Sequence, residues 1–258
     1  MSGFGWAEFA RDLPVALGAA LGVMLVTFLI ALRKGVHRIV DVAWGLGFAA
    51  VALVSYAMST GDGDDGRRVL VTVLTVVWGL RLAVHIGRRG RGHGEDPRYE
   101  ALLAKAPGNP ALYALRTVYL LQGALVWLIS LPVLTLWAVM AAPVFPELWA
   151  AVSSPDIDTF RFKADPANKG RIMDRGLWSW TRHPNYFGDF CVWWGLFLVV
   201  CTDPAVAAAT LVSPLVMSFL LTRGSGKALL ERHMAGRPGY AEYRARTSGF
   251  FPRPPRRS

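Results

Sequence analysis

Long apolar runs separated by short polar segments set the pattern of this chain. Four runs of 19 residues or more carry no charged side chain: 13–32, 42–61, 117–146 and 204–222. A helix needs about 20 apolar residues to cross the hydrocarbon core of a bilayer, which is roughly 30 Å thick. Each of the four runs therefore predicts a transmembrane helix.

Two further apolar runs contain ionisable residues. The run 69–87 includes Arg81 and His85, and the run 184–202 includes Asp189. Proline suits the first turn of a helix, because that turn has no intrahelical partner for its N–H group, so Pro184 is a natural helix start. These runs predict two more crossings.

The basic residues fix the expected topology. Of the 28 Lys and Arg residues, 24 lie in the connections 33–38, 88–116 and 161–182 and in the tail from residue 223. Basic residues mark the cytoplasmic side of a membrane protein. All 24 fall on one side only if the chain crosses again within 147–160. We therefore expect an all-α integral membrane protein with about seven transmembrane helices, the N-terminus outside and the C-terminus cytoplasmic, in the cell (inner) membrane.

The expected crossing within 147–160 is unusual. This segment holds polar residues, Ser153, Ser154, Pro155, Asp156 and Asp158. Fourteen residues of helix rise only about 21 Å. Irregular backbone at membrane depth is tolerated where it is buried in protein or lines a cavity. We expect a broken helix that lines a cavity here.

The amino-acid composition is typical of a membrane protein, and the distribution of charge indicates which partners to expect. Hydrophobic residues make up 53% of the chain and charged residues 18%. The net charge of +10 would suit a nucleic-acid binder, but the charges lie between apolar runs rather than on one soluble face. We expect membrane lipids as partners, no nucleic acid and no metal. The sequence predicts a single transmembrane domain over 1–258 with a disordered tail at 253–258, and it does not indicate an oligomeric state.

Charged side chains inside membrane spans are costly and are therefore candidates for function. Asp41 begins the second span, Arg81 lies in the third, and Asp189 lies in the sixth. The alternative is that the side chain reaches back to the membrane interface. That alternative suits Asp41 and Asp189 about as well as function does, and it suits Arg81 less.

The densest polar cluster is GRIMDRGLWSWTRHPNYFGDF at 170–190. On a helix that starts near Pro184, Asn185 and Asp189 share a face. A helix N-terminus favours an anion, and arginine forks match phosphate oxygens. The cluster predicts a site for a phosphate-bearing cofactor, whereas a basic membrane-anchoring loop is the alternative. Its candidate residues are Arg171, Arg175, Arg182, His183, Asn185, Tyr186 and Asp189.

Several motifs together resemble a known family. They are VDVAWGLGF at 40–48, EDPRY at 95–99, FKADPANKGRIMDRGLW at 162–178, TRHPNYFGD at 181–189 and RPGYAEYRARTSGFFP at 237–252. These motifs resemble the steroid 5α-reductase superfamily, specifically its bacterial members of unassigned function. RHPxY by itself is less specific, because membrane methyltransferases such as isoprenylcysteine carboxyl methyltransferase share it.

The resemblance implies a seven-helix membrane fold that holds NADPH in the cytoplasmic halves of its later helices. It suggests cofactor contacts from Arg81, Arg91, Arg171, Asn185, Asp189 and Arg223, with Asp156 near the position of the family's cofactor-contacting acid. The family uses an acid in the second span and a tyrosine in the third to polarise a substrate carbonyl. Asp41 is the only acid in the second span, and the third span has no tyrosine, so His85 is the nearest proton donor. The segment before FKADP is also shorter than in the family.

The leading hypothesis is NADPH-dependent reduction of a C=C bond in a lipid or steroid-like enone. Asp41 would polarise the carbonyl if protonated, and His85 would assist. An S-adenosylmethionine-dependent methyltransferase is the first alternative, since RHPNYFGD and Glu231 are compatible with it. A non-catalytic lipid-binding protein is the second. The sequence leaves steroid, polyprenyl, fatty acyl and quinone-like substrates open.

Overall fold

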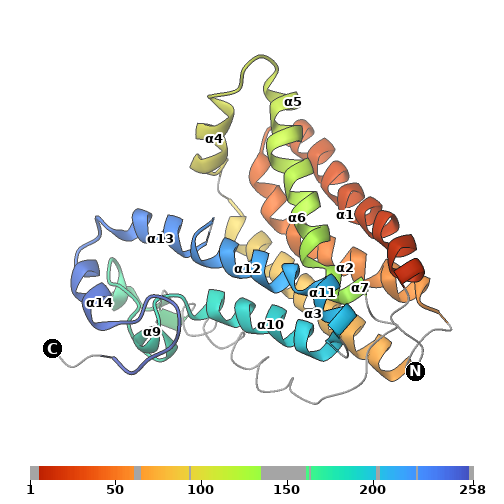
Figure 1. Ribbon diagram of the computed structural model, residues 1–258. Helices are drawn as coiled ribbons and strands as arrows, with labels where there is room; N and C mark the ends of the chain where they lie inside the picture. The colour runs from red at the N-terminus through yellow and green to blue at the C-terminus, as the bar shows by residue number, and fades with distance from the viewer. Residues whose placement is uncertain are drawn as a thin grey trace. The chain divides into compact units, whose positions relative to one another are not determined.

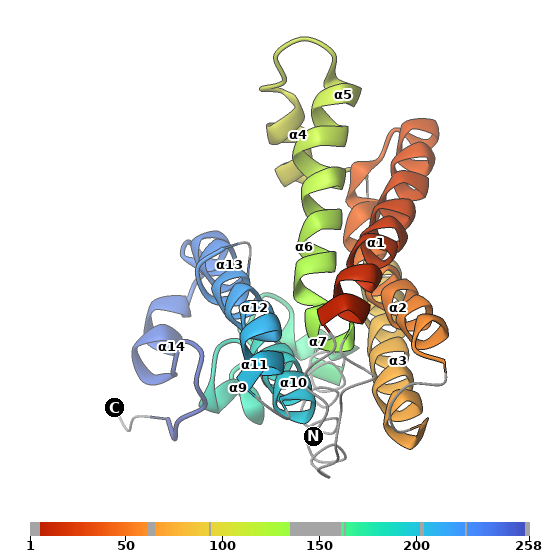
Figure 2. The ribbon, with the colours of Figure 1, turned by 45° about the vertical axis from the view of Figure 1, so that its right-hand side comes forward.

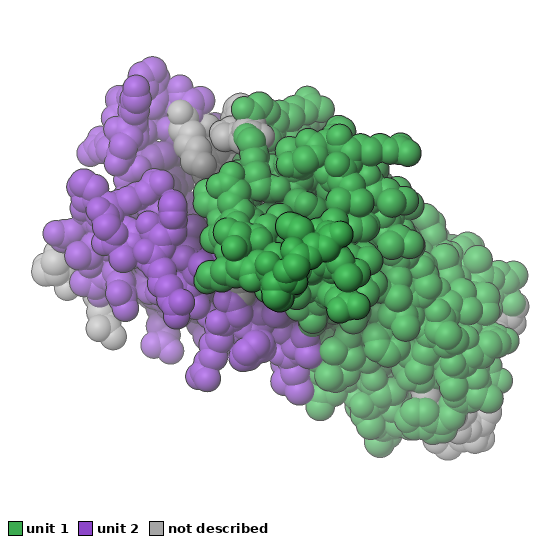
Figure 3. Space-filling model, turned by 90° about the horizontal axis from the view of Figure 1, so that it is seen from above, with its two compact units in different colours: residues 1–141, 196–213 green, residues 142–195, 214–258 purple. Residues whose placement is uncertain are grey.

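A computed structural model describes residues 6–60, 65–92, 94–134, 161–162, 164–201, 204–224 and 226–255. Over these residues the protein is helical, apart from loops and an isolated parallel bridge between Thr181 and Ser248. The chain divides into two compact units, which Figure 3 shows in different colours. Unit 1 comprises Met1–Ala141 and Leu196–Ser213, and unit 2 comprises Ala142–Gly195 and Pro214–Ser258.

Unit 1 is built on long apolar helices. Helices α1 (Trp6–Lys34), α2 (Val40–Met58) and α3 (Asp65–Gly90) pack in sequence, and α6 (Leu121–Ile129) packs against both α1 and α2 (Figures 1 and 2). Each of these helices hides one face in the unit and leaves large apolar side chains exposed on the other. An apolar outer face is what a bilayer requires of a spanning helix.

Two glycines let α2 and α3 approach closely. A Cβ atom on Gly45 would lie 2.1 Å from the carbonyl oxygen of Gly79, and a Cβ on Gly79 would lie 2.4 Å from that of Gly45. Small residues at such a crossing allow backbones to touch in membrane helices. The contact fixes the start of α2, where Asp41 lies, relative to α3.

The fourth long element of unit 1 is interrupted by a π-helix. It runs through α5 (Pro110–Ala114), η2 (Leu115–Leu120) and α6, and α7 (Leu131–Leu134) follows it. The Asn109 side chain caps the N-terminus of α5 by accepting from the backbone N–H of Ala111 at 2.9 Å. π-helical turns are frequent at functional sites because they redirect side chains, and this one carries Tyr119.

A short helix, α4 (Pro97–Leu103), lies between α3 and α5, in the loop region at one end of unit 1 (Figure 1). Asp96 caps it by accepting from the backbone N–H of Arg98 at 2.9 Å, and Pro97 occupies its first turn. The short 3₁₀ helix η1 (His37–Ile39) forms the turn between α1 and α2. The EDPRY motif therefore forms the start of α4.

Unit 2 contains the cluster that the sequence singled out. Its elements are η4 (Pro166–Asn168), α9 (Leu177–Trp180), the first part of α10 (Pro184–Val200), most of α12 (Val212–Thr222), α13 (Lys227–Met234) and α14 (Tyr240–Arg246). Trp194 on α10 donates to the Ser218 hydroxyl on α12 at 3.0 Å. Helix α11 (Pro204–Thr210) belongs to unit 1.

Five of the expected apolar helices are confirmed in the described residues, the one from 117–146 only over its described part. Five helical stretches are long and apolar enough to cross a membrane: Trp6–Lys34, His37–Met58, Arg68–Gly90, Pro110–Ile129 and Pro204–Met234. Helix α10 starts at Pro184 as predicted, but it has only 17 residues. The predicted crossing within 147–160 lies outside the described residues. The protein is thus an all-α, multi-pass membrane protein by the length and composition of its helices.

Candidate functional site

A stripe of hydrogen-bonded side chains runs along the start of α2 in unit 1, and we call it the polar ladder. His37, Asp41 and Trp44 are spaced by four and then three residues, so they lie on one helix face. Each is hydrogen-bonded to a partner from η2, α6 or α4. The ladder consists of His37, Asp41, Trp44, Tyr99, Tyr119 and Gln122.

Asp41 forms the central rung of the ladder. The Tyr99 hydroxyl donates to its Oδ1 at 2.6 Å, and the Arg98 guanidinium donates to its Oδ2 at 2.9 Å. Arg98 is at the same time paired with Asp96 at 2.9 Å. The Asp41 side chain keeps 28% of its surface exposed, whereas Tyr99 is 8% exposed. Asp41 is therefore an ion-paired hydrogen-bond acceptor that a small molecule can still approach.

The electrostatics of this rung keep the tyrosine protonated. Burial, and after it the neighbouring Asp41 carboxylate, raise the pKa of Tyr99 above its ordinary value. The hydrogen bond to Arg98 lowers the pKa of Asp96, and the same hydrogen bond raises the pKa of Arg98. A carboxylate thus accepts from a neutral phenol. Tyr99 is a proton donor held in place by an anion.

A second branch of the ladder orients Tyr99 from the other side. The Trp44 indole N–H donates to Gln122 Oε1 at 2.5 Å. The Gln122 side chain also hydrogen-bonds the Tyr99 hydroxyl, which favours the phenolate and offsets part of the rise in the Tyr99 pKa. An amide whose oxygen is already occupied presents its NH₂ group, so Gln122 is fixed as a donor toward Tyr99.

The remaining rung joins His37 to Tyr119. The His37 Nδ1 lies 3.0 Å from the Tyr119 hydroxyl. Glu95, the first residue of EDPRY, accepts from the backbone N–H groups of both His37 and Arg38, the latter at 2.8 Å. Arg38 in return donates to the carbonyl of Gly94 at 2.9 Å. The segment that carries Tyr99 is therefore tied to the turn that carries His37.

In unit 2, Arg182 holds the C-terminal segment against the start of α10. Its guanidinium donates to Glu231 Oε1 from Nη2 at 2.6 Å and from Nε at 3.0 Å. It also donates to the carbonyls of Thr247 and Arg244, the latter at 3.1 Å. Arg182 is 8% exposed, and most of its N–H groups already have protein acceptors. We call Arg182, His183, Glu231 and Thr247 the C-terminal clamp.

His183 is the second partner of Glu231. Its Nε2 lies 3.3 Å from Glu231 Oε1, and its ring stacks on Tyr186 at 5.5 Å between centroids. Burial lowers the pKa of His183 to about 4 against the raising effect of Glu231, so the ring is neutral at physiological pH. A neutral ring that donates from Nε2 must leave Nδ1 as an acceptor. Within the described residues, that Nδ1 and the Asn185 Oδ1 are buried without a hydrogen-bond partner.

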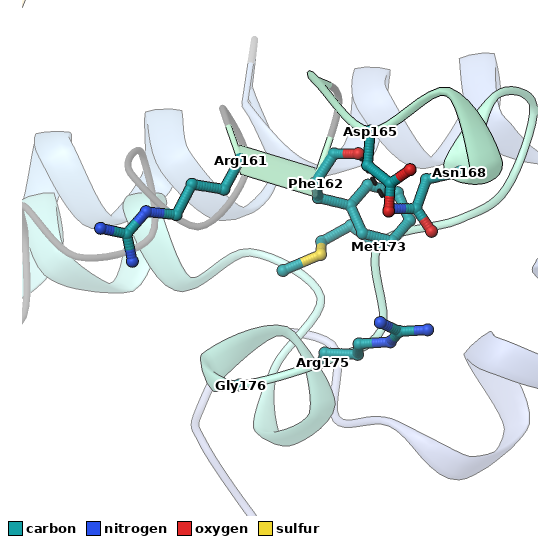
Figure 4. Close-up of a pocket in the computed structure, with 7 residues that line it drawn as sticks. All are labelled: Arg161, Phe162, Asp165, Asn168, Met173, Arg175 and Gly176. Carbon is teal, nitrogen blue, oxygen red and sulfur yellow. Dashed lines mark hydrogen bonds between the residues drawn. The ribbon is translucent and has the colours of Figure 1, made fainter.

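Unit 2 contains an open pocket of about 380 Å³, whose lining includes Arg161 and Arg175 (Figure 4). In Figure 4 the Arg175 guanidinium lies across the pocket from Asp165 and Asn168, whereas Arg161 points away from them. The Asn168 amide donates to the Phe162 carbonyl at 3.0 Å and to the Asp165 carboxylate at 3.3 Å. The lining residues are Arg161, Phe162, Asp165, Asn168, Met173, Arg175 and Gly176.

The predicted site residues fall into both units. Within unit 1, Arg81 and His85 are half-buried and one turn apart on α3, and Arg91 is exposed just after that helix. Within unit 2, Asn185 and Asp189 lie one turn apart on α10 as predicted, and Arg171 and Arg223 are exposed. Asp156 lies outside the described residues. The cofactor contacts assigned to these residues, and to Arg182, His183 and Tyr186, stay predictions.

Sequence reasoning missed the tyrosine that contacts Asp41. The search for a partner considered the third span and reached His85, but Tyr99 is 58 residues from Asp41 and belongs to α4. The available signal was the EDPRY motif, which carries an acid, a helix-starting proline and a tyrosine within five residues. No spacing rule connects that motif to the second span, so only the fold reveals the pair.

The comparisons with known proteins give one assignment. No curated protein and no solved structure matches the sequence. The family described as "Protein of unknown function (DUF1295)" matches residues 27–247, a range that includes the whole polar ladder and the whole C-terminal clamp. Since this match covers most of the chain, the protein belongs to the DUF1295 family.

Proposed function

We propose that this protein is a membrane-embedded, NADPH-dependent reductase of an activated C=C bond in a lipid or steroid-like enone. The observation that carries the proposal is the Asp41–Tyr99 pair, a protonated phenol held at 2.6 Å by a carboxylate at the end of a membrane helix bundle. Reduction of an enone requires a group that donates to the carbonyl oxygen as negative charge develops there. Tyr99 has that property.

The residues of unit 2 fit a dinucleotide phosphate. Exposed arginines near the start of α10 match the charge of several phosphates, and Arg171, Arg175 and Arg223 are those that would hold them. The buried acceptors His183 Nδ1 and Asn185 Oδ1 fit amide or hydroxyl donors of such a cofactor. Bound NADPH would supply the hydride.

Tyr99 and Asp41 have separate tasks in this proposal. In the structure the single Tyr99 hydroxyl proton is donated to Asp41 Oδ1, which holds the phenol in place. On substrate binding this hydroxyl would turn from Asp41 to the substrate carbonyl and stabilise the enolate that forms. Asp41 keeps its ion pair with Arg98 and does not donate a proton itself. This division replaces the expectation that a protonated Asp41 polarises the substrate, and it supplies the tyrosine that the third span lacks.

We further propose seven crossings, with the N-terminus outside and the C-terminus cytoplasmic, in the cell (inner) membrane. The five described spans and the basic residues that follow α1 and α3 support this orientation. Cysteines introduced singly at Thr60 and Lys105, which are both exposed, test it with a membrane-impermeant thiol reagent in Cys191→Ser/Cys201→Ser cells. We expect labelling from outside at position 60 alone, and the reverse pattern would contradict the orientation.

A second candidate is an S-adenosylmethionine-dependent methyltransferase. It is favoured by one observation: Glu231 lies against His183 of the RHPNY motif. The motif and this acid are the features that sequence reasoning connected with membrane methyltransferases. The number of arginines in unit 2 favours NADPH, which carries phosphate groups, over S-adenosylmethionine, which carries none.

Binding and turnover separate the two candidates. The purified protein in lipid nanodiscs should gain thermal stability from NADPH and not from S-adenosylmethionine, because a ligand stabilises the state to which it binds. NADPH oxidation should then depend on an added lipid enone, with the saturated ketone as product. Stabilisation by S-adenosylmethionine alone, or binding of neither cofactor, would contradict the reductase.

A further inference from the structure

The proposed reduction needs a supply of protons at a buried site, and this need rests on the proposed function. In each turnover bound NADPH would supply a hydride to the β-carbon and leave as NADP⁺. The electron pair of the C=C bond becomes an enolate, which takes one proton. If Tyr99 gives that proton, its O–H bond breaks and the phenolate must be reprotonated before the next turnover. Tyr99 is only 8% exposed, so direct access of water to it is restricted.

The polar ladder places a second hydrogen-bonded rung beside Tyr99. His37 and Asp41 are four residues apart at the start of α2, and Tyr119 and Gln122 are three apart along η2 and α6. Side chains at these spacings are neighbours, with Cβ atoms about 5–6 Å apart. The His37–Tyr119 rung therefore lies one helical turn from the rung that holds Tyr99. The step from Tyr119 to Tyr99 would need one bridging water.

This second rung leads from the surface to the interior. Tyr119 is fully buried, at 0% exposure, whereas His37 is half-exposed. Their side chains meet at 3.0 Å. A histidine is the side chain whose ordinary titration range brackets physiological pH, so it can take a proton from water and pass it on.

The same segment fixes both rungs. Glu95 accepts from the backbone N–H of His37 and of Arg38, and four residues later Tyr99 donates to Asp41. Two titratable groups from other elements contact His37 in the described residues: Tyr119 of η2 lies against its ring Nδ1, and Glu95 before α4 accepts from its backbone N–H. The charged residues adjacent to it in the chain are Arg33 and Lys34 at the end of α1, Arg38 in η1 and Asp41 in α2.

We propose that His37 and Tyr119 form the path by which a proton from water reaches Tyr99. In each turnover His37 takes one proton from water, Tyr119 receives one from His37 while giving up its own, and the Tyr99 phenolate receives that one. One proton enters at the surface and one leaves with the product. Because the proton enters at His37 Nε2 and leaves from Nδ1, the ring then exchanges a proton with water to regain its starting tautomer. His37 and Tyr119 act through Tyr99 and do not touch the substrate.

The test compares the variants His37→Gln and Tyr119→Phe with the control His233→Gln, an exposed histidine in α13. We expect kcat for NADPH-dependent enone reduction to fall about tenfold or more, because proton transfer contributes factors of this order. KM should stay unchanged, and the pH–rate profile should lose a limb that the control keeps. Added imidazole should restore turnover of His37→Ala. A kcat and pH profile equal to those of the control would overturn the relay.

An NMR measurement on the cofactor-free protein tests the contact between His37 and Tyr119 independently of turnover. Ring ¹⁵N resonances of His37 in the cofactor-free protein report its titration, and Tyr119→Phe should shift that titration because it removes the hydrogen-bond partner of Nδ1. An unchanged titration would overturn the rung. If Tyr119→Phe fails to fold, His37→Gln carries the test alone. If the wild-type protein oxidises no NADPH with any lipid enone, the reductase proposal fails, whereas normal turnover in His37→Gln removes only the relay.

Discussion

The Asp41–Arg98 pair in unit 1 and the Arg182–Glu231 pair in unit 2 are both charge pairs, but they differ in what surrounds them. The arginine of the first pair is 46% exposed, and its acid also accepts from a phenol. The arginine of the second pair is 8% exposed and bonds to a carboxylate and two backbone carbonyls. The Asp41–Arg98 pair is accessible and has a protonated phenol beside it, which suits a role in catalysis. The Arg182–Glu231 pair has a buried arginine whose hydrogen bonds are taken up by the protein, which suits a role in stabilising the fold.

Removal of the buried guanidinium should have the largest effect on stability. We expect Arg182→Met to lose about 3–5 kcal/mol of unfolding free energy, because it removes a buried guanidinium that bonds to the half-buried Glu231 carboxylate and to two backbone carbonyls. Denaturant unfolding in detergent measures the change. Arg244→Ala is the matched control, since its side chain is exposed and only its backbone carbonyl contacts Arg182. Equal stability of both variants would contradict the clamp.

Acid should destabilise unit 2 through His183, with a somewhat smaller effect. Burial lowers its folded-state pKa to about 4, from an ordinary value of 6.5. A depressed folded pKa means that the unfolded chain binds the proton first, so this stability is complete above about pH 6.5 and is lost as the pH falls toward 4. The loss should reach on the order of 3 kcal/mol.

Unfolding measured between pH 7.5 and pH 4.5 checks the effect of His183. The variant His183→Phe should show a flatter dependence on pH over that range, since it removes the titrating group. A pH dependence as steep as that of the wild type would assign the effect to another residue.

A glycine beside the clamp provides a milder perturbation. A Cβ atom on Gly249 would lie 3.0 Å from Lys227 Nζ and 3.1 Å from Arg182 Nη2. We expect Gly249→Ala to cost about 1 kcal/mol, since the ends of flexible side chains can shift. Gly236→Ala is the control, because nothing lies within 4 Å of a Cβ there. The melting temperatures of the two variants are compared. A Gly249→Ala variant more stable than the wild type would show that the C-terminal clamp can accommodate an additional methyl group.

The accessible pair should contribute least to stability. Arg98→Gln removes the ion pairs with Asp41 and Asp96, but the arginine is 46% exposed, and such pairs contribute roughly 0–1 kcal/mol. We expect its unfolding free energy to stay near that of the wild type. A loss comparable with that of Arg182→Met would mean that both pairs are structural and would erase the contrast between the units.

The helices were predictable because hydrophobic run length is a local property. The runs 13–32, 42–61 and 69–87 coincide with α1, α2 and α3, and Pro184 begins α10. The π-helical turn at η2 left no such signal, because apolar runs do not reveal hydrogen-bond register.

The partners within the candidate site were not predictable in the same way. Asp41 was identified from its depth in the membrane, but Tyr99 meets it across 58 residues of sequence, and Gln122 meets Trp44 across 78. Arg182 was predicted as a phosphate ligand from its charge, whereas its burial and its bonds to Glu231 and Thr247 could not be read from the sequence. Long-range contacts decide both cases.

The most direct test of the central claim is the turnover number of Tyr99→Phe in NADPH-dependent reduction of a lipid enone in nanodiscs. Tyr113→Phe is the control, a tyrosine of α5 outside the polar ladder. We predict a kcat about 100-fold below wild type for Tyr99→Phe with unchanged NADPH affinity, because only the donor to the carbonyl is lost. A kcat equal to that of Tyr113→Phe would contradict the assignment of Tyr99 as the proton donor.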